Sequence, residues 1–232
     1  MLIIGLFWLK NIQIHLPHLS NHTKMTDAQA LAIFCKTPER GFVKTRLAAS
    51  VGDQKALEIY LNLLNITDEE TRPFSSSRYL FLTSAVEDSL EKMRSTLQEQ
   101  DLFTASKTSF ISQQGEDLGQ RMSTAFKELF KNHQSVVLIG CDLPELTSTL
   151  ISKAFDALQS NDAVIGPSCD GGYYLIGLKK ETPDLFNEIS WSTEKVLKQT
   201  LERAQQLSLK VQLIDELRDI DTVEDLRFSK LK

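Results

Sequence analysis

The chain has 232 residues, of which 41% are hydrophobic and 25% are charged, as in ordinary globular proteins that bury a substantial core. Its formal net charge of −5 argues against general binding of nucleic acid, so any cluster of cations is local and informative. The cysteines, Cys35, Cys141 and Cys169, have no paired spacing, which favours a reduced, cytoplasmic location.

Residues 1–24 differ from the rest of the chain. Their apolar run, LIIGLFWL, is too short to span a membrane, and neither a basic segment nor a small-residue cleavage site flanks it. Met25 opens MTDAQALAIF, which reads as the natural start of a domain. We therefore expect 1–24 to be a disordered or mis-started extension, 25–232 to be the domain, and no stable membrane insertion. A leader that touches a membrane is the alternative.

From Met25 onward, short apolar runs alternate with amphipathic segments of helical length. The apolar runs predict strands at 30–35, 78–84, 108–113, 135–141, 162–167, 173–178 and 210–215. The amphipathic segments predict helices at 53–70, 86–99, 117–132, 147–160, 193–207 and 222–229. This alternation predicts a single α/β domain with a mostly parallel sheet and helices on both faces. Ligands in such sheets bind beyond the carboxyl ends of the strands, so the residues that follow each strand matter most.

The first predicted strand runs directly into KTPERGFVKTRL. Four cations gather on this one turn: Lys36, Arg40, Lys44 and Arg46. Pro38 and Gly41 shape the turn, and the segment from Lys44 reads as a helix start whose amides could face an anion. Arg offers a fork for phosphate oxygens and Lys a point charge. The stretch predicts a phosphate-binding loop that is not a Walker A loop. A solvated basic turn is the alternative.

Two carboxylates follow later strands. Asp142 comes directly after SVVLIGC, and Asp221 lies in LRDIDTVEDL ahead of the last predicted helix. Mg²⁺ or Mn²⁺ bound to phosphates takes one or two protein carboxylates, so these two residues are candidate metal ligands. The alternatives are that Asp142 merely ends a strand and that Asp221 caps the final helix. Asp219, two positions before Asp221, stays open as a neighbour.

The stretch GPSCDGGYYLIGL suggests either a tight hairpin or a ligand contact. Gly171 and Gly172 permit a close approach of the backbone to a ligand, and a hairpin turn explains them equally well. Asp170 is a candidate general base only because it follows a strand. Tyr173 and Tyr174 are adjacent in a strand and point to opposite faces, so we expect one of them in the core.

Two further segments carry candidate ligand contacts. In GEDLGQRM, Gly119 and Arg121 could bring backbone and charge towards a base, sugar or phosphate; the alternative is a loop and an amphipathic helix capped near Asp117. Trp191 precedes a Ser/Thr helix cap, where an aromatic side chain is usually a packing staple but could line an acceptor pocket.

Together, KTPERGFVKTRL, GEDLGQRM, LIGCDLPEL, GPSCDGGYYLIGL, WST and DIDTVEDL resemble a bacterial family of GT-A-fold transferases. Its members are the selenodomain-associated and arsenosugar-biosynthesis-type glycosyltransferases, and the resemblance covers roughly residues 30–228. A more distant similarity is to phospholactate guanylyltransferases and to molybdenum-cofactor and sugar-1-phosphate nucleotidyltransferases. The resemblance implies the GT-A, nucleotide-diphospho-sugar transferase fold.

The resemblance also implies roles for individual residues. Lys36, Lys44 and Arg46 would bind nucleotide phosphates, and Lys44 and Arg46 would stabilise the charge of the leaving group. Asp142 would be the principal metal ligand and Asp221 the second. The residue before Asp142 is commonly small and polar in the family, and here it is a cysteine. The remaining candidates are Arg40, Gly41, Gly119 and Arg121 for the nucleotide and Gly171, Gly172, Tyr173 and Trp191 for a substrate pocket.

These expectations point to a transferase that depends on Mg²⁺ or Mn²⁺ and uses a nucleotide-activated donor. Glycosyl transfer from a nucleotide-sugar to an unidentified small molecule is the first hypothesis; nucleotidyl transfer from a nucleoside triphosphate, with release of pyrophosphate, is the second. A non-catalytic nucleotide-binding or scaffold protein is the third. A Rossmann dehydrogenase is excluded because no G-x-G-x-x-G follows the first strand. Monomer and homodimer both stay open.

Overall fold

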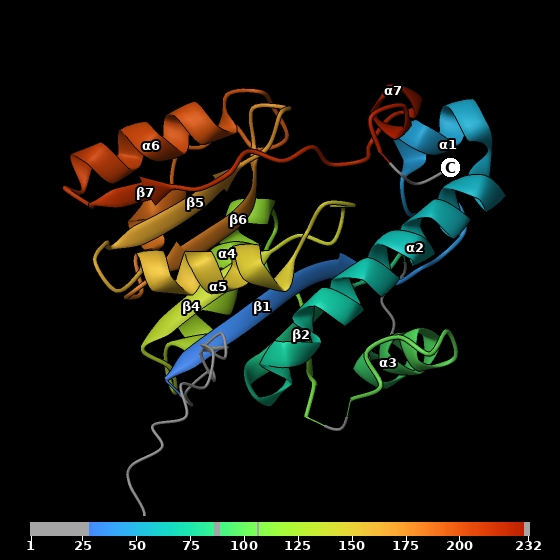
Figure 1. Ribbon diagram of the computed structural model, residues 1–232, viewed down its shortest axis with the longest axis horizontal. Coiled ribbons are helices and arrows are strands. Elements are labelled where there is room, and N and C mark those ends of the chain that lie inside the picture. The colour runs from blue at the N-terminus through green and yellow to red at the C-terminus, as the bar shows by residue number, and fades with distance from the viewer. Residues whose placement is uncertain (1–27, 86–88, 106, 230–232) are drawn as a thin grey trace, which may run out of the picture.

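The computed structural model describes residues 28–85, 89–105 and 107–229 (Figure 1). The expectation for residues 1–24 therefore lies outside the described residues. Within the described ranges, no helix is both long and apolar enough to cross a membrane.

Seven strands form one sheet in the order β3-β2-β1-β4-β6-β5-β7. Their bounds are β1 Gln29–Lys36, β2 Arg78–Thr83, β3 Ser109–Ser112, β4 Ser135–Ile139, β5 Ala163–Pro167, β6 Tyr173–Leu178 and β7 Val211–Leu213. All seven predicted strands are present. Every neighbouring pair is parallel except those of β6, which runs antiparallel to β4 and β5. The prediction of a mostly parallel sheet is confirmed.

The six predicted helices are present, all but α2 with shorter ends, and α1 follows the helix start expected at Lys44. Their bounds are α1 Thr45–Val51, α2 Asp53–Thr71, α3 Leu90–Gln98, α4 Leu118–Leu129, α5 Ser148–Ala157, α6 Val196–Gln206 and α7 Val223–Leu226, with 3-10 turns η1 Arg72–Ser77 and η2 Pro183–Phe186. Helix α3 starts later than predicted because the side chain of Ser89 accepts a hydrogen bond from the amide of Lys92 and caps the helix there.

Alternate residues of the central strands pack on opposite faces of the sheet. Leu31 and Ile33 of β1 join a buried cluster with α2, α3 and α5, whereas Ala30 and Ala32 join a second cluster with α4 and α6. Helices therefore cover both faces, as predicted (Figure 1). Strands that are apolar throughout, such as β4, are required because both of their faces are buried.

A buried ion pair joins α2 to β2. The Arg78 side chain is fully buried, and its Nη1 donates to Asp68 Oδ1 at 2.8 Å. Its other nitrogens donate to Thr108 Oγ1, and the amide of Phe103 donates to Asp68 Oδ2. Because this buried pair lies at the amino end of β2, away from the carboxyl ends where ligands bind, we assign it to stability.

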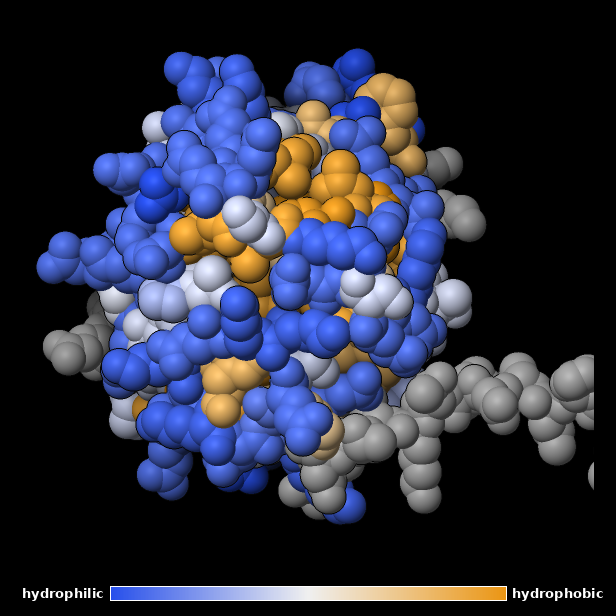
Figure 2. All heavy atoms as spheres, turned by 90° about the vertical axis from the view of Figure 1, so that its left-hand side faces the viewer, coloured by the Kyte–Doolittle hydropathy of each residue, from blue (hydrophilic) through white to orange (hydrophobic). Residues whose placement is uncertain are grey.

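The edge of the sheet formed by β7 is a short strand that exposes an apolar residue. Strand β7 pairs only with β5, and the Leu213 side chain on it is 44% exposed. Figure 2 shows apolar side chains gathered in the upper half of this side of the molecule, the half that holds α6 and β7. A homodimer stays a prediction.

Candidate functional site

A cleft of about 450 Å³ lies at the carboxyl ends of β1, β2, β3 and β4. It is the place where ligands bind in open α/β sheets. Seven of the residues singled out in the sequence line it, six of them charged: Lys36, Lys44, Arg46, Arg121, Asp142 and Asp221. The seventh is Tyr173. The other singled-out residues lie outside its lining: Arg40, Gly41, Gly119, Asp170, Gly171, Gly172 and Trp191.

Lys44 stands at the centre of the cleft. It precedes α1 in a left-handed backbone conformation, with φ of 49°, and its side chain is only 3% exposed. Its Nζ lies 2.7 Å from Oδ1 of Asp142 and 3.1 Å from Oδ1 of Asp221. Burial alone would lower the pKa of this ammonium, but the two carboxylates outweigh burial, so the pKa is raised and the charge is retained.

Both carboxylate oxygens of Asp221 form ion pairs. Oδ1 pairs with Lys44, and Oδ2 accepts a hydrogen bond from Nη2 of Arg46 at 2.7 Å. Asp221 does not cap the last helix, so that alternative is wrong. Thr222 is the N-cap, in a capping box with Asp225.

Asp142 keeps one oxygen available. Its side chain is 43% exposed, Oδ1 pairs with Lys44, and Oδ2 has no hydrogen-bond partner within the residues that the structure describes. No group of three His, Cys, Asp or Glu side chains that could hold a metal occurs in those residues either. This donor set fits a divalent cation that arrives on phosphate, because such an ion needs only one or two protein carboxylates.

The basic turn divides into a part inside the cleft and a part outside it. Lys36 lines the cleft, with Nζ 5.0 Å from the centre of the Phe42 ring. Arg40 is exposed on the outside of the turn. The backbone of Lys36 is fixed by Tyr60, whose hydroxyl both accepts from the Lys36 amide and donates to its carbonyl, each at 2.9 Å. The same hydroxyl lies 3.4 Å from Sγ of Cys141, so it ties the end of β1 to the end of β4.

Two of the singled-out glycines, Gly119 and Gly171, lie in close contact with other parts of the chain. A Cβ on Gly119 would lie 2.5 Å from Cζ2 of Trp191, so glycine is required here for the indole to pack on the start of α4. Trp191 and Gly119 line a separate pocket of about 350 Å³. Gly171 has φ of +88°, and a Cβ there would lie 2.3 Å from the Glu194 carbonyl oxygen. Its close approach is to the chain itself, as the hairpin alternative predicted.

Asp170 turns back on its own hairpin. Its Oδ1 accepts a hydrogen bond from the amide of Gly172 at 2.9 Å. The pKa of the Asp219 carboxyl is raised, first because the group is partly buried and second because the negative charge of Asp170 lies nearby. The tyrosines behave as predicted: Tyr174 is 6% exposed on one face, and Tyr173 packs on the other.

Several lining residues were not singled out in the sequence. Gln113, which directly follows β3, lines the cleft with Thr83, Leu118 and Ser192. The predicted strand at 108–113 included Gln113, whereas β3 ends at Ser112, so the rule that led to Asp142, a polar residue just past a strand, did not reach Gln113. An uncharged residue with no glycine or proline beside it gives no further signal.

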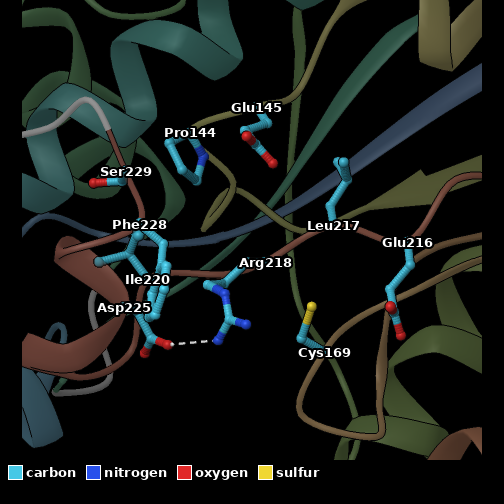
Figure 3. A pocket seen from close by; sticks show the side chains of 10 residues that line it. All are labelled: Pro144, Glu145, Cys169, Glu216, Leu217, Arg218, Ile220, Asp225, Phe228 and Ser229. Atoms are coloured by element: carbon cyan, nitrogen blue, oxygen red, sulfur yellow. Dashed lines mark hydrogen bonds and ion pairs between the residues drawn. The ribbon is translucent and has the colours of Figure 1, made fainter.

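A second cleft, of about 230 Å³, lies on the other side of the segment that precedes α7. Figure 3 shows its side chains, among them Glu145, Glu216 and Arg218. Arg218 pairs with Asp225 at 3.5 Å and lies 4.8 Å from the centre of the Phe228 ring. Its described lining holds one cation, Arg218, against the three carboxylates Glu145, Glu216 and Asp225. The first cleft is lined by four cations and two carboxylates, so it suits a phosphate group better.

Comparison with known proteins decides the family. The profile of the family described as "Uncharacterized protein conserved in bacteria (DUF2064)" matches residues 71–193, more than half of the chain. The chain belongs to this family. No curated protein matches this chain at a significant level.

Solved structures share its fold. A proposed nucleotide-diphospho-sugar transferase from Desulfovibrio desulfuricans G20 is 35% identical to this chain, with a TM-score of 0.78 over 87% of this chain and 85% of that one. A 4-diphosphocytidyl-2C-methyl-D-erythritol synthase from Anaerococcus prevotii is 12% identical, with a TM-score of 0.55 over 87% and 97%. The inositol-1-phosphate CTP transferase from T. maritima is 14% identical, with a TM-score of 0.52 over 85% and 91%. The predicted nucleotide-diphospho-sugar transferase fold is confirmed.

Proposed function

We propose that this protein is a metal-dependent glycosyltransferase that transfers a sugar from a nucleoside-diphosphate sugar to a small-molecule acceptor. The observation that carries the proposal is the set of ion pairs in the main cleft, where Asp221 holds Lys44 and Arg46 side by side and Asp142 keeps an oxygen free. The similarity to the Desulfovibrio protein supports the donor class. We also propose that the protein is one of the selenodomain-associated or arsenosugar-biosynthesis-type transferases that its sequence resembles.

The cations are arranged to receive a diphosphate. An ammonium carries three N–H donors. Lys44 directs two of its donors to Asp142 and Asp221 and keeps a third for a phosphate oxygen. The Arg46 side chain is 75% exposed and uses only Nη2 on Asp221, so the rest of its fork is available. Lys36 adds a third positive charge to the same cleft.

In glycosyl transfer the bond between sugar C1 and the diphosphate oxygen breaks, and negative charge builds on the leaving diphosphate. Lys44 and Arg46 would stabilise this charge, and Asp221 would keep them in place before the reaction begins. A Mg²⁺ or Mn²⁺ ion bound through Asp142 would supply further charge neutralisation. Asp170 remains a proposal as the base for the acceptor, although its side chain is engaged with Gly172.

Nucleotidyl transfer is the second candidate, and the same cations favour it. A triphosphate and the pyrophosphate that it releases need concentrated positive charge, which Lys36, Lys44 and Arg46 provide. The two reactions differ in their products. Glycosyl transfer releases a nucleoside diphosphate, and nucleotidyl transfer releases pyrophosphate.

A thermal-shift screen with nucleotide-sugars and nucleoside triphosphates, with and without Mg²⁺ or Mn²⁺, tests the proposal. A ligand present at about 100 times its Kd should raise the unfolding temperature by roughly 5–10 °C. Asp142→Asn should abolish the metal-dependent part of the shift. The matched control is Asp215→Asn, a surface carboxylate whose side chain is 56% exposed and pairs only with Lys153.

Each outcome separates the candidates. A metal-dependent shift with a nucleotide-sugar, lost in Asp142→Asn and kept in Asp215→Asn, supports the proposal. Pyrophosphate release from a nucleoside triphosphate would replace glycosyl by nucleotidyl transfer. Nucleotide binding that is the same in Asp142→Asn would point to a non-catalytic nucleotide-binding protein.

A further inference from the structure

Gln113 presents a fixed hydrogen-bond acceptor to the main cleft. Its amide nitrogen, Nε2, donates to the carbonyl oxygen of Phe81 at 2.9 Å and lies 3.4 Å from that of Cys35. Its backbone amide donates to the carbonyl oxygen of Leu82 at 2.8 Å, which fixes the start of the side chain. Since both partners of the side-chain amide are carbonyl oxygens, the nitrogen must face them and the oxygen must point away.

The side-chain oxygen of Gln113 is available for a ligand. Oε1 has no hydrogen-bond partner within the described ranges, and it is not among their buried unsatisfied atoms, of which Thr200 Oγ1 is the one example. Because Gln113 lines the cleft, this oxygen meets the solvent of the cleft. Hydrogen bonds to β1 and β2 hold it there, so little conformational entropy is lost when it binds a ligand.

The surroundings of this oxygen suit a nucleobase. Leu118, at the start of α4, lines the same cleft and is one of the large hydrophobic residues that stay exposed, at 43%. It offers an apolar surface to a flat ring. The amide of Gln113 lies over β2 and β1, and β4 is the next strand, so the amide is about 5–10 Å from the phosphate-binding end of β4. A ribose spans such a gap.

We propose that Gln113 selects the base of the donor by accepting a hydrogen bond from an exocyclic amino group. This inference rests on the proposed function and adds the substrate class: cytosine, adenine or guanine rather than uracil. A uracil carbonyl oxygen in the same place would face Oε1 with no hydrogen between the two acceptors. The loss of one hydrogen bond and the unpaired acceptor should reduce affinity about tenfold.

Calorimetric titration in the presence of Mg²⁺ tests this inference. The probes are the pairs CDP and UDP, ADP and IDP, and GDP and IDP, in which one member carries an amino group that the other lacks. Inorganic pyrophosphate is the probe without a base. The variants are Gln113→Met and, as a matched control, Gln159→Met, whose amide pairs on the surface with Asp156.

The wild type should bind the amino member of at least one pair about tenfold more tightly than the other member. Gln113→Met should lose this preference and bind pyrophosphate as the wild type does, and Gln159→Met should change neither. Equal affinity within all three pairs in the wild type would overturn the role of Gln113 while leaving the phosphate site intact. Failure to bind pyrophosphate and every diphosphate would instead refute the proposed function.

Discussion

The Nζ of Lys44 lies 3.1 Å from Oδ1 of Asp221, although 177 positions separate the two residues in the sequence. The contact depends on Ile220, which is fully buried against α1 and α2. The amide of Ile220 also donates to the carbonyl oxygen of Asp142 at 3.0 Å. The segment before α7 is therefore held beside the end of β4, where the carboxylate of Asp221 reaches the same lysine as Asp142.

Lys44→Met should increase the affinity for Mn²⁺ in the absence of any nucleotide. The ammonium now lies between the two carboxylates, and its removal leaves Asp142 and an oxygen of Asp221 facing each other. Two carboxylates that lack a shared cation attract a divalent ion more strongly. Mn²⁺ binding followed by electron paramagnetic resonance measures the change.

The same variant should lose about 1–3 kcal/mol of unfolding free energy. This lies below the ~3–5 kcal/mol of a fully buried pair because Asp142 can rehydrate its exposed side. Arg46→Met is the control, since Arg46 is exposed and touches only Asp221. Unchanged or weaker Mn²⁺ binding by Lys44→Met would show that the lysine does not compete with the metal.

Arg78→Met should lower the unfolding free energy by about 3–5 kcal/mol and leave ligand binding unchanged. It would leave the carboxylate of Asp68, which is 5% exposed, without its buried partner. Arg72→Ala is the matched control: Arg72 also pairs with Asp68, but its side chain is 61% exposed, so the loss should be at most about 1 kcal/mol. Chemical denaturation measures both. Equal losses would contradict the assignment of stability to burial.

Gly119→Ala should destabilise the protein by about 1–3 kcal/mol, because the added methyl group overlaps the indole of Trp191. Trp191→Ala opens that space. The double variant should therefore be more stable than the sum of the two single changes predicts. Thermal unfolding of the four proteins completes the cycle. Strictly additive effects would mean that the two residues do not meet.

Alkylation should distinguish the three cysteines. Cys169 is exposed, whereas Cys35 and Cys141 are buried and none of the three is in a disulfide. Burial raises the pKa of the Cys141 thiol to about 12 and that of Cys35 well above its usual value. Since the thiolate is the reactive form, iodoacetamide at pH 9 should modify Cys169 alone in the native protein and all three cysteines in denaturant. Mass spectrometry reads the sites.

The fold could be predicted from the sequence because each strand is a short apolar run and each helix has an amphipathic period. The convergence of Lys44 and Asp142 followed from one topological rule, since both come after strands that are neighbours in the sheet. The pairing of Lys44 with Asp221 did not follow, because it depends on how Ile220 packs.

The surroundings of three other residues also depend on contacts that form only in the folded protein. Gly119 looked like a residue that admits a ligand, but the group that fills its space is Trp191, brought there by tertiary packing. Asp170 follows a strand as Asp142 does, yet its side chain accepts a hydrogen bond from its own turn. Gln113 carries no charge and no special backbone, so only its hydrogen bonds in the folded protein reveal that its oxygen is free.

The most direct test of the phosphate site is a calorimetric titration of CDP or ADP with Mg²⁺ into the wild type and a Lys44→Gln, Arg46→Gln double variant. Both proteins should unfold cooperatively, and the double variant should bind at least about 100-fold more weakly, because two charge-assisted contacts to phosphate are lost. A folded double variant that keeps the wild-type affinity would contradict the assignment of the cleft to phosphate.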